Sequence, residues 1–249
     1  MTTPYRFLLF DCMNTLFLPD HSSLPTVHHN GREVPSTAET LQQHLAPRWP
    51  QLAAEDIHAA QRQAWRWAEA QRGALCREVP ASTRFRYMLE LLNIHDATDA
   101  EITAAADAHI DAVIACYALP PTHRQTLEQW QQRVPLGLFS NFDHAPGVRR
   151  LLVRDGLADS FAPVVISAEL GWRKPGEEAF SRAIAQVTTQ CGVPMQQILF
   201  VGDSLEDDVA GAAAAGLDMR WFNPKGLEAP PHQQPPEQIA ALEELLELF

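Results

Sequence analysis

The chain of 249 residues carries a formal net charge of −12, and 46% of its residues are hydrophobic. This acidity argues against binding to nucleic acid or to an anionic membrane surface, although local positive groups still allow a small anionic substrate. No apolar run approaches the ~20 residues that a membrane helix needs. The four cysteines are far apart and form no CxxC pair. That spacing is typical of a reducing compartment, and we expect a cytoplasmic monomer or homodimer.

Five apolar runs predict buried strands. They cover residues 6–10, 134–140, 164–167, 198–203 and 219–222. Helical patterns fill the intervals between the later runs, at residues 122–133, 147–155, 177–190 and 207–215. Strands that alternate with helices of this length predict an α/β fold, with a Rossmann-like parallel sheet covered by helices on both faces.

The interval between the first two predicted strands does not follow this alternation. Between residues 17 and 119 no convincing strand is present, but helical stretches cover residues 36–46, 53–72, 82–92 and 99–117. We therefore predict an α/β core at residues 1–18 and 119–249, interrupted by an inserted helical domain at residues 19–118.

Irregular segments flank these elements. Residues 19–35 predict a loop that carries three histidines, His21, His28 and His29. A linker is indicated near the other end of the chain by four prolines, Pro230, Pro231, Pro235 and Pro236. Residues 238–249 then predict a helix that docks on the core through one apolar face, formed by Ile239, Leu242, Leu245 and Leu246.

An acidic residue ends the first predicted strand. Asp11 follows four apolar residues, and Asn14 and Thr15 then turn the chain. The carboxyl ends of the strands are where open parallel sheets bind their ligands. Asp11 is therefore the first candidate for a catalytic residue.

Two further candidate sites lie at a later strand end and a later helix start. Ser140 and Asn141 follow the second strand, where a hydroxyl and a turn amide can donate to phosphate oxygens. Taken alone, these residues are also explained by helix capping or an Asx turn. Lys174, one of only two lysines, stands before Pro175 and a predicted helix N-terminus. Its ammonium and the helix dipole can together neutralise an anion.

The fourth candidate site follows the predicted strand at residues 198–203. Asp203 ends this strand as Asp11 ends the first, and Asp207 and Asp208 begin the next helix. Two carboxylates at adjacent strand ends are costly without a cation between them, and Mg²⁺ accepts one or two carboxylates plus water. We therefore predict magnesium as a cofactor, although the same residues can also form a helix-capping turn.

The order and spacing of these four sites resemble the haloacid dehalogenase-like hydrolases. The motifs as they stand here are DCMNT, SN, KP and GDSLEDD. The resemblance covers the whole chain apart from the sequence detail of the helical insertion. It implies strand order 3-2-1-4-5 in the core, and it makes the insertion a mobile cap that closes over the active site and sets most of the substrate choice.

The resemblance also implies how a metal and the nucleophile are arranged. In relatives the first Asp attacks phosphorus and forms an aspartyl-phosphate that water hydrolyses, and this role falls on Asp11. Mg²⁺ would be held by Asp11, by Asp203 and by the backbone carbonyl of Met13. Asp208 would fix a metal-bound water or Lys174, and Asp207 is a less secure assistant.

The remaining motif residues are implied to handle the phosphoryl group. Ser140, Asn141 and Thr15 would bind it, and Lys174 would balance the charge on the nucleophile and on the pentavalent state. Asp11, Lys174 and Ser140 are thus the predicted catalytic residues. The expected partner is a small anionic molecule.

One residue departs from the family pattern DxDxT. Its second Asp protonates the leaving oxygen and later activates water in phosphatases, but here that position holds Met13. Loss of such acid–base help typically costs 10² to 10⁴-fold in rate. Three interpretations stay open: a magnesium-dependent hydrolase of small phosphorylated metabolites, a 2-haloacid dehalogenase, or a non-catalytic protein that binds phosphate and metal. The intact Gly202-Asp203 favours the first, because dehalogenase relatives work without metal and typically lack this pair.

The insertion contributes residues of ambiguous role. Arginines gather near Trp65 and could clamp an anionic or aromatic substrate; they are Arg62, Arg66, Arg72 and Arg77. We favour the alternative that they cover a solvated helix face while Trp65 packs inside. The loop histidines could supply the missing acid or base, although such residues are more often simply exposed. Cys12 is expected to be a packing residue.

Overall fold

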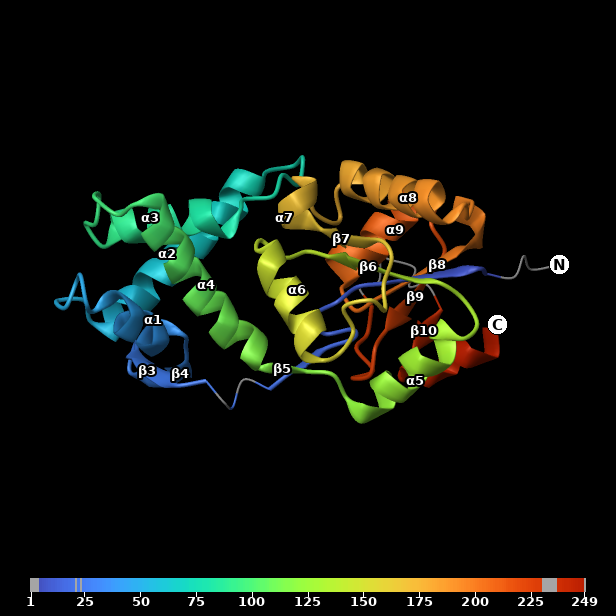
Figure 1. The fold of residues 1–249 in the computed structure, drawn as a ribbon, viewed down its shortest axis with the longest axis horizontal. Coiled ribbons are helices and arrows are strands. Elements are labelled where there is room, and N and C mark those ends of the chain that lie inside the picture. Colours follow the sequence, from blue (N-terminus) through green and yellow to red (C-terminus); the bar gives the residue numbers. More distant parts are fainter. Residues whose placement is uncertain (1–4, 21, 23, 230–236, 249) are drawn as a thin grey trace.

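The protein consists of an α/β lobe and a helical lobe joined side by side (Figure 1). A computed structural model describes residues 5–20, 22, 24–229 and 237–248. Both labelled ends of the chain lie on the α/β lobe, and the helical lobe forms the far end of the molecule. Within the described part of the chain, no helix is both long and apolar enough to span a membrane.

A six-stranded parallel sheet forms the centre of the α/β lobe. Its order is β10-β9-β8-β1-β6-β7, and all neighbours pair in parallel. The strands are β1 (Phe7–Phe10), β6 (Leu136–Ser140), β7 (Val164–Ile166), β8 (Ile198–Gly202), β9 (Met219–Phe222) and β10 (Gln238–Ile239). Without β10, this is the expected order 3-2-1-4-5. The additional strand β10 lengthens the sheet beyond β9.

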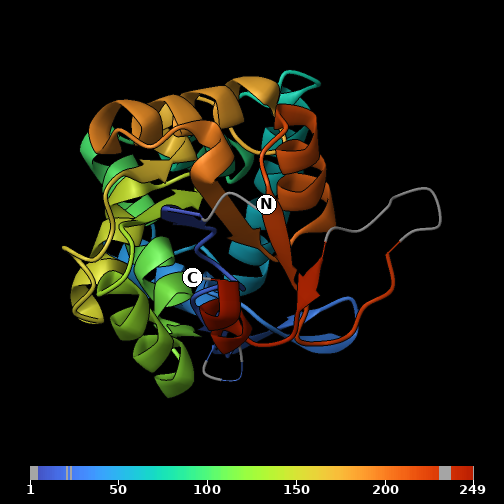
Figure 2. The same ribbon diagram turned by 90° about the vertical axis from the view of Figure 1, so that its right-hand side faces the viewer.

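Helices cover both faces of the sheet because its central strand is apolar on both sides. All four side chains of β1 are fully buried. Leu8 and Phe10 join the apolar cluster beneath α5 (Pro121–Gln131) and α6 (Ala145–Arg154). Phe7 and Leu9 join the cluster beneath α8 (Glu177–Cys191) and α9 (Ala210–Ala215). Successive strand residues point to opposite faces, so a run without polar residues requires both covers. Figure 2 shows the orange α8 on one side of the sheet and the green α5 on the other.

The C-terminal segment docks on the core as expected, but in a different conformation. Leu242 and Leu245 are fully buried in the cluster under α5. They belong to a 3₁₀ helix, Leu242–Leu248, whereas Ile239 lies on β10 and pairs with Phe222. The predicted single helical face was therefore wrong for Ile239. The four prolines of the predicted linker lie outside the described residues.

Four helices build the helical lobe around an apolar cluster of its own. They are α1 (Ala38–Leu45), α2 (Ala54–Arg72), α3 (Ala81–Leu91) and α4 (Asp99–Ala115). The predicted ends of all four helices agree with the structure to within two residues. Thr98 starts α4 with a capping box, in which its hydroxyl and the Glu101 carboxylate each accept a backbone N–H. The cluster contains buried residues from every helix, among them Leu41, Ile57, Phe85 and Ile102.

The prediction that residues 17–119 contain no strand was wrong. A hairpin of β3 (Thr26–His29) and β4 (Arg32–Pro35) occupies the predicted loop, and Asn30 and Gly31 turn it with positive φ angles of 51° and 76°. The two chain crossings between the lobes also pair, as β2 (Leu18–Pro19) and β5 (Tyr117–Ala118). The two connections therefore lie side by side.

Candidate active site

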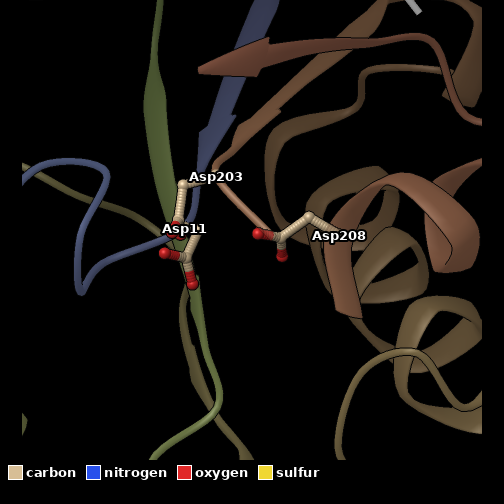
Figure 3. A group of neighbouring side chains, drawn as sticks. All are labelled: Asp11, Asp203 and Asp208. Carbon is tan, nitrogen blue, oxygen red and sulfur yellow. The ribbon is translucent and has the colours of Figure 1, made fainter. Parts of the chain in front are cut away.

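Three carboxylates converge at the carboxyl end of the central strands. Asp11 directly follows β1, Asp203 follows its neighbour β8, and Asp208 lies on the next helical turn, Leu205–Val209. One oxygen from each carboxylate lies within 4.8 Å of the other two. Figure 3 shows the three side chains directed toward a common space. Adjacent parallel strands end at the same edge of the sheet, which is why distant segments of sequence meet there.

A buried lysine joins two of these carboxylates. Lys174 Nζ donates to Asp11 Oδ1 at 2.7 Å, to Asp208 Oδ1 at 2.6 Å and to the carbonyl of Phe139 at 3.0 Å. Only 1% of the lysine is exposed. Burial alone lowers the pKa of Lys174, but the two carboxylates outweigh burial, so the pKa is raised and the ammonium stays charged.

The carboxylates outnumber the positive charges in contact with them. Burial raises the pKa of Asp11, and Asp208 and Asp203 raise it further against the opposing effect of Lys174. Burial and Asp208 likewise raise the pKa of Asp203. Three carboxylates that share one ammonium are thus short of positive charge, which is the condition that a divalent cation relieves.

Other atoms of the site fit a cation and a phosphoryl group. Hydrogen bonds of the turn after β1 use the carbonyls of Cys12 and Phe17, and none in the described chain uses that of Met13. This carbonyl is therefore available as an oxygen ligand. Ser140 Oγ is buried beside the Cys12 thiol and lacks an oxygen or nitrogen partner among the described residues. Such a hydroxyl is suited to an oxyanion that the protein alone does not provide.

Two predicted substrate contacts point elsewhere. Thr15 is fully buried, and its Oγ1 donates to Asp203 Oδ1 at 3.3 Å, so the hydroxyl contacts a carboxylate of the site. The Asn141 side chain bonds the backbone N–H and carbonyl of Lys174, at 2.8 and 2.9 Å, and also donates to Asp207 Oδ2 at 3.1 Å. The hydrogen-bonding groups of its side-chain amide are thereby occupied by Lys174 and Asp207. Only its backbone is left for a phosphoryl oxygen.

The fourth motif folds tightly around Asp208. Asp208 Oδ2 accepts the backbone N–H of Ser204 at 2.9 Å, and the Ser204 hydroxyl accepts that of Asp207 at 3.0 Å. A Cβ atom on Gly202 would lie 2.5 Å from the carboxyl carbon of Asp208. The strand therefore needs glycine at this position for the carboxylate to reach Lys174.

A cavity of about 300 Å³ opens over the carboxylates, and part of its lining was missed by the sequence analysis. Met13, Asn141 and Asp207 line it as expected, but so do Asn14, Arg173 and Ser204. Asn14 has a φ of 64°, which only a few non-glycine residues adopt, asparagine most readily. The clearest sequence signal for Arg173 was its position next to Lys174.

The helical lobe is docked onto the segment that carries the lysine. We call residues 171–176 the lysine loop. The N–H of Glu78 donates to Gly171 O at 3.1 Å, and that of Arg173 donates to Cys76 O at 2.9 Å. The guanidinium of Arg77 lies 3.8 Å from the ring centre of Trp172. Residues 73–80 of the helical lobe thus form part of the wall of the lysine loop.

Glu78 is the buried centre of this contact. Its side chain is fully buried and lies 3.3 Å from Arg72 and 3.6 Å from Arg173, and the Ser167 hydroxyl donates to it. A second buried ion pair joins Arg84 of α3 to Asp143, just beyond Asn141, at 2.7 Å. Both lobes therefore contribute charges to a buried interface beside the carboxylate cluster.

The ambiguous residues of the helical lobe follow expectation only in part, because Arg62, Arg66 and Arg77 are exposed, as expected of a solvated face, whereas Trp65 and Arg72 are not placed as expected. Trp65 is 46% exposed and does not pack inside. Arg72 is buried in the pairs described above, so it does not belong to a solvated face. His28 is exposed beside Glu33, and His29 lies against the ring of His58, while His21 falls outside the described residues. No described loop histidine lines the cavity over the carboxylates. Cys12 is fully buried, as expected of a packing residue.

Comparison with known proteins agrees with this geometry. Residues 5–216 match the family of haloacid dehalogenase-like hydrolases. The chain belongs to this family. The hydrolase is also 30% identical over 247 residues to the pyrimidine 5'-nucleotidase YjjG of Escherichia coli (strain K12), which covers 98% of each protein.

Solved structures of the same fold span the whole hydrolase. A 2-haloacid dehalogenase from Pseudomonas syringae pv. Tomato DC3000 superposes with a TM-score of 0.68 at 23% identity, covering 98% of this chain and 97% of the other. The HAD-hydrolase YfnB from Bacillus subtilis, in a form bound to magnesium, superposes with a TM-score of 0.64 at 21% identity, covering 99% of each chain. At these identities the structures establish the shared fold.

Proposed function

We propose that this chain is a magnesium-dependent hydrolase of small phosphomonoesters, with Asp11 as the nucleophile. The observation that carries the proposal is the cluster of Asp11, Asp203 and Asp208 with Lys174 bonded between two of them. In this proposal residues 19–118 act as the cap over a core of residues 1–18 and 119–249.

The arrangement assigns a role to each side chain. Lys174 holds Oδ1 of Asp11, which leaves Oδ2 free to attack phosphorus. Attack forms a bond from this oxygen to phosphorus and breaks the bond to the leaving oxygen, giving an aspartyl-phosphate. Water then attacks phosphorus, releasing inorganic phosphate and the Asp11 carboxylate. Lys174 and the free hydroxyl of Ser140 stabilise the negative charge on the transferring oxygens.

A magnesium ion would be held by the Asp11 and Asp203 carboxylates and the Met13 carbonyl, with Asp208 nearby to bond a metal-bound water. When bound, it supplies positive charge that neutralises the phosphoryl oxygens. Thr15 keeps Asp203 in position for this role through its hydroxyl. Gly202 gives Asp208 the room to approach.

Met13 sets the expected substrate preference. Its thioether has no proton for the leaving oxygen, although Met13 is one of the residues that line the catalytic cavity. Leaving groups that depart without a proton, such as aryl or acyl phosphates, should therefore react best. Because the relative YjjG is a pyrimidine 5'-nucleotidase, pyrimidine nucleoside 5'-monophosphates are the first metabolites to test.

Met13 also favours a second candidate function, the displacement of halide from a 2-haloacid, since halide leaves without a proton. The charge at the site opposes it. A metal-free dehalogenase has no use for two additional carboxylates beside its nucleophile, because they would repel an anionic haloacid.

Turnover by wild type, Asp11→Asn and Met13→Asp separates these functions. The substrates are phosphate esters, an acyl phosphate and 2-haloacids, each with Mg²⁺ and with EDTA. We expect Mg²⁺-dependent phosphate release that is lost in Asp11→Asn and rises about 10²-fold or more for alkyl esters in Met13→Asp. Halide release in EDTA would establish the dehalogenase. Stabilisation by Mg²⁺ and a phosphate analogue, with no turnover of any substrate, would establish a binding protein.

A further inference from the structure

A second cavity, of about 350 Å³, lies in the helical lobe. It is bordered by one face of α2, the start of α1, and residues of α3 and α4. Its lining shares no residue with the catalytic cavity. Three arginines contribute to this lining, Arg62, Arg66 and Arg84. No Asp or Glu among the described residues does so.

Two of these arginines are not neutralised by the protein. Arg62 and Arg66 are one turn apart on α2, so both reach the same side of the helix. In the described chain neither has an acidic partner, whereas Arg48, Arg72, Arg84 and Arg86 of the same lobe all do. The cavity therefore concentrates positive charge in a protein of net charge −12. Such a concentration attracts an anion.

A buried histidine of the same wall holds an unpaired polar atom that is itself shielded from solvent. His58 is 7% exposed, lines the cavity, and its Nε2 has no hydrogen-bond partner among the described residues. Its Nδ1 lies 2.8 Å from the hydroxyl of Ser36, which also accepts the N–H of Ala38 at 3.1 Å. With Ser36 donating to Nδ1, the neutral ring carries its hydrogen on Nε2. This N–H is a donor for which the protein offers no acceptor.

The rim of the cavity offers a flat apolar surface beside the charges. Trp65 lines the cavity with 46% of its surface exposed. The guanidinium of Arg84 lies 5.3 Å from the Trp65 ring centre, and the Arg84 side chain also reaches Asp143 of the α/β lobe. The cavity is thus connected through one side chain to the segment that follows Ser140 and Asn141.

We propose that this cavity is an anion-binding site, in which Arg62 and Arg66 bind a phosphate or carboxylate group and the exposed face of Trp65 contacts the rest of the ligand. Guanidinium groups match both kinds of oxyanion through paired hydrogen bonds. The anionic group belongs either to a second position on the substrate or to a separate anionic effector.

Binding of inorganic phosphate in EDTA, measured by titration calorimetry, tests the site directly. Without metal the catalytic cavity repels phosphate, because Asp11, Asp203, Asp207 and Asp208 outnumber Lys174 and Arg173 there. We expect the wild type to bind, and the Arg62→Gln/Arg66→Gln variant to bind at least tenfold more weakly. Arg86→Gln is the matched control, since Arg86 is an exposed arginine of the same lobe that pairs with Asp99 outside the cavity.

Unchanged affinity in the double variant, an equal loss in Arg86→Gln, or no binding by the wild type at millimolar phosphate would overturn the proposal. This measurement needs no turnover, so it tests the anion-binding site independently of the proposed phosphatase activity. Kinetics, which do rest on that activity, assign the source of the anion. If the cavity binds a second anionic group of the substrate, the double variant should have a raised KM for esters that carry two anionic groups but an unchanged KM for phenyl phosphate. An effector predicts that added anion changes phenyl phosphate hydrolysis in the wild type alone.

Discussion

Replacing Lys174 by methionine tests whether the buried lysine holds the clustered carboxylates together. The substitution keeps most of the apolar stem but removes the ammonium that contacts Asp11 at 2.7 Å and Asp208 at 2.6 Å. Both carboxylates remain buried, and removal of one partner from a buried ion pair costs about 3–5 kcal/mol. For a chain of this length we expect the melting temperature to fall by roughly 6–20 °C. Urea denaturation in EDTA, followed by circular dichroism, measures the free energy of unfolding.

Two companion variants make this test specific. Lys225→Met removes the only other lysine, which is exposed, and should change the free energy of unfolding by less than about 0.5 kcal/mol. Asp208→Asn should couple to Lys174→Met, so that the double variant loses at least about 1 kcal/mol less than the sum of the single losses. Strict additivity, or a loss in Lys174→Met no larger than in Lys225→Met, would refute the assigned charge balance.

Three further predictions concern the surroundings of the site. Gly202→Ala should lower the free energy of unfolding by about 1–3 kcal/mol and remove most of the activity, because the added Cβ would displace Asp208. Normal turnover in this variant would contradict the prediction. His109 lies on α4 in the lining of the second cavity, and burial and Arg84 lower its pKa to about 3. This value is below the pKa in the unfolded chain, so the contribution of His109 to the free energy of unfolding is complete above about pH 6.5 and is lost on acidification. Between pH 7.5 and pH 5 the free energy of unfolding of the wild type should thus fall by about 2 kcal/mol more than that of His109→Gln. Parallel pH profiles of stability in the two proteins would contradict the lowered pKa of His109. Glu78→Gln should cost about 1.5–3 kcal/mol and speed tryptic cleavage at Arg77, and an unchanged digestion rate would count against the docked loop.

The sequence predicts the long elements of the fold well, because their patterns are strong. Uninterrupted apolar runs mark strands that are buried on both faces, and 3.6-residue periodicity marks the helices. The missed strands β2, β5 and β10 have two residues each, which is too short for any periodicity. The hairpin of β3 and β4 did carry a signal, Asn30-Gly31, but its strands are largely polar and exposed.

The candidate site is predictable as a set of residues but not as a set of contacts. Motif order brought Asp11, Lys174, Asp203 and Asp208 to one place, and the structure has them there. It does not follow from the motifs which way each side chain turns, and Thr15 is assigned differently for this reason. Contacts between the lobes are harder still to predict from the sequence. Arg84 and Asp143 are 59 positions apart, and nothing local in either segment identifies its partner.

The docking of Glu78 on the lysine loop bears on how such proteins can be recombined. A grafted helical lobe that has no carboxylate at the position of Glu78 would leave Arg173 without its buried counter-charge. The loop that positions Lys174 would then rest on a foreign surface. A functional chimera must therefore carry residues 73–80 with the α/β lobe, so the useful exchange boundaries lie inside the helical lobe and not at the two connections beside β2 and β5.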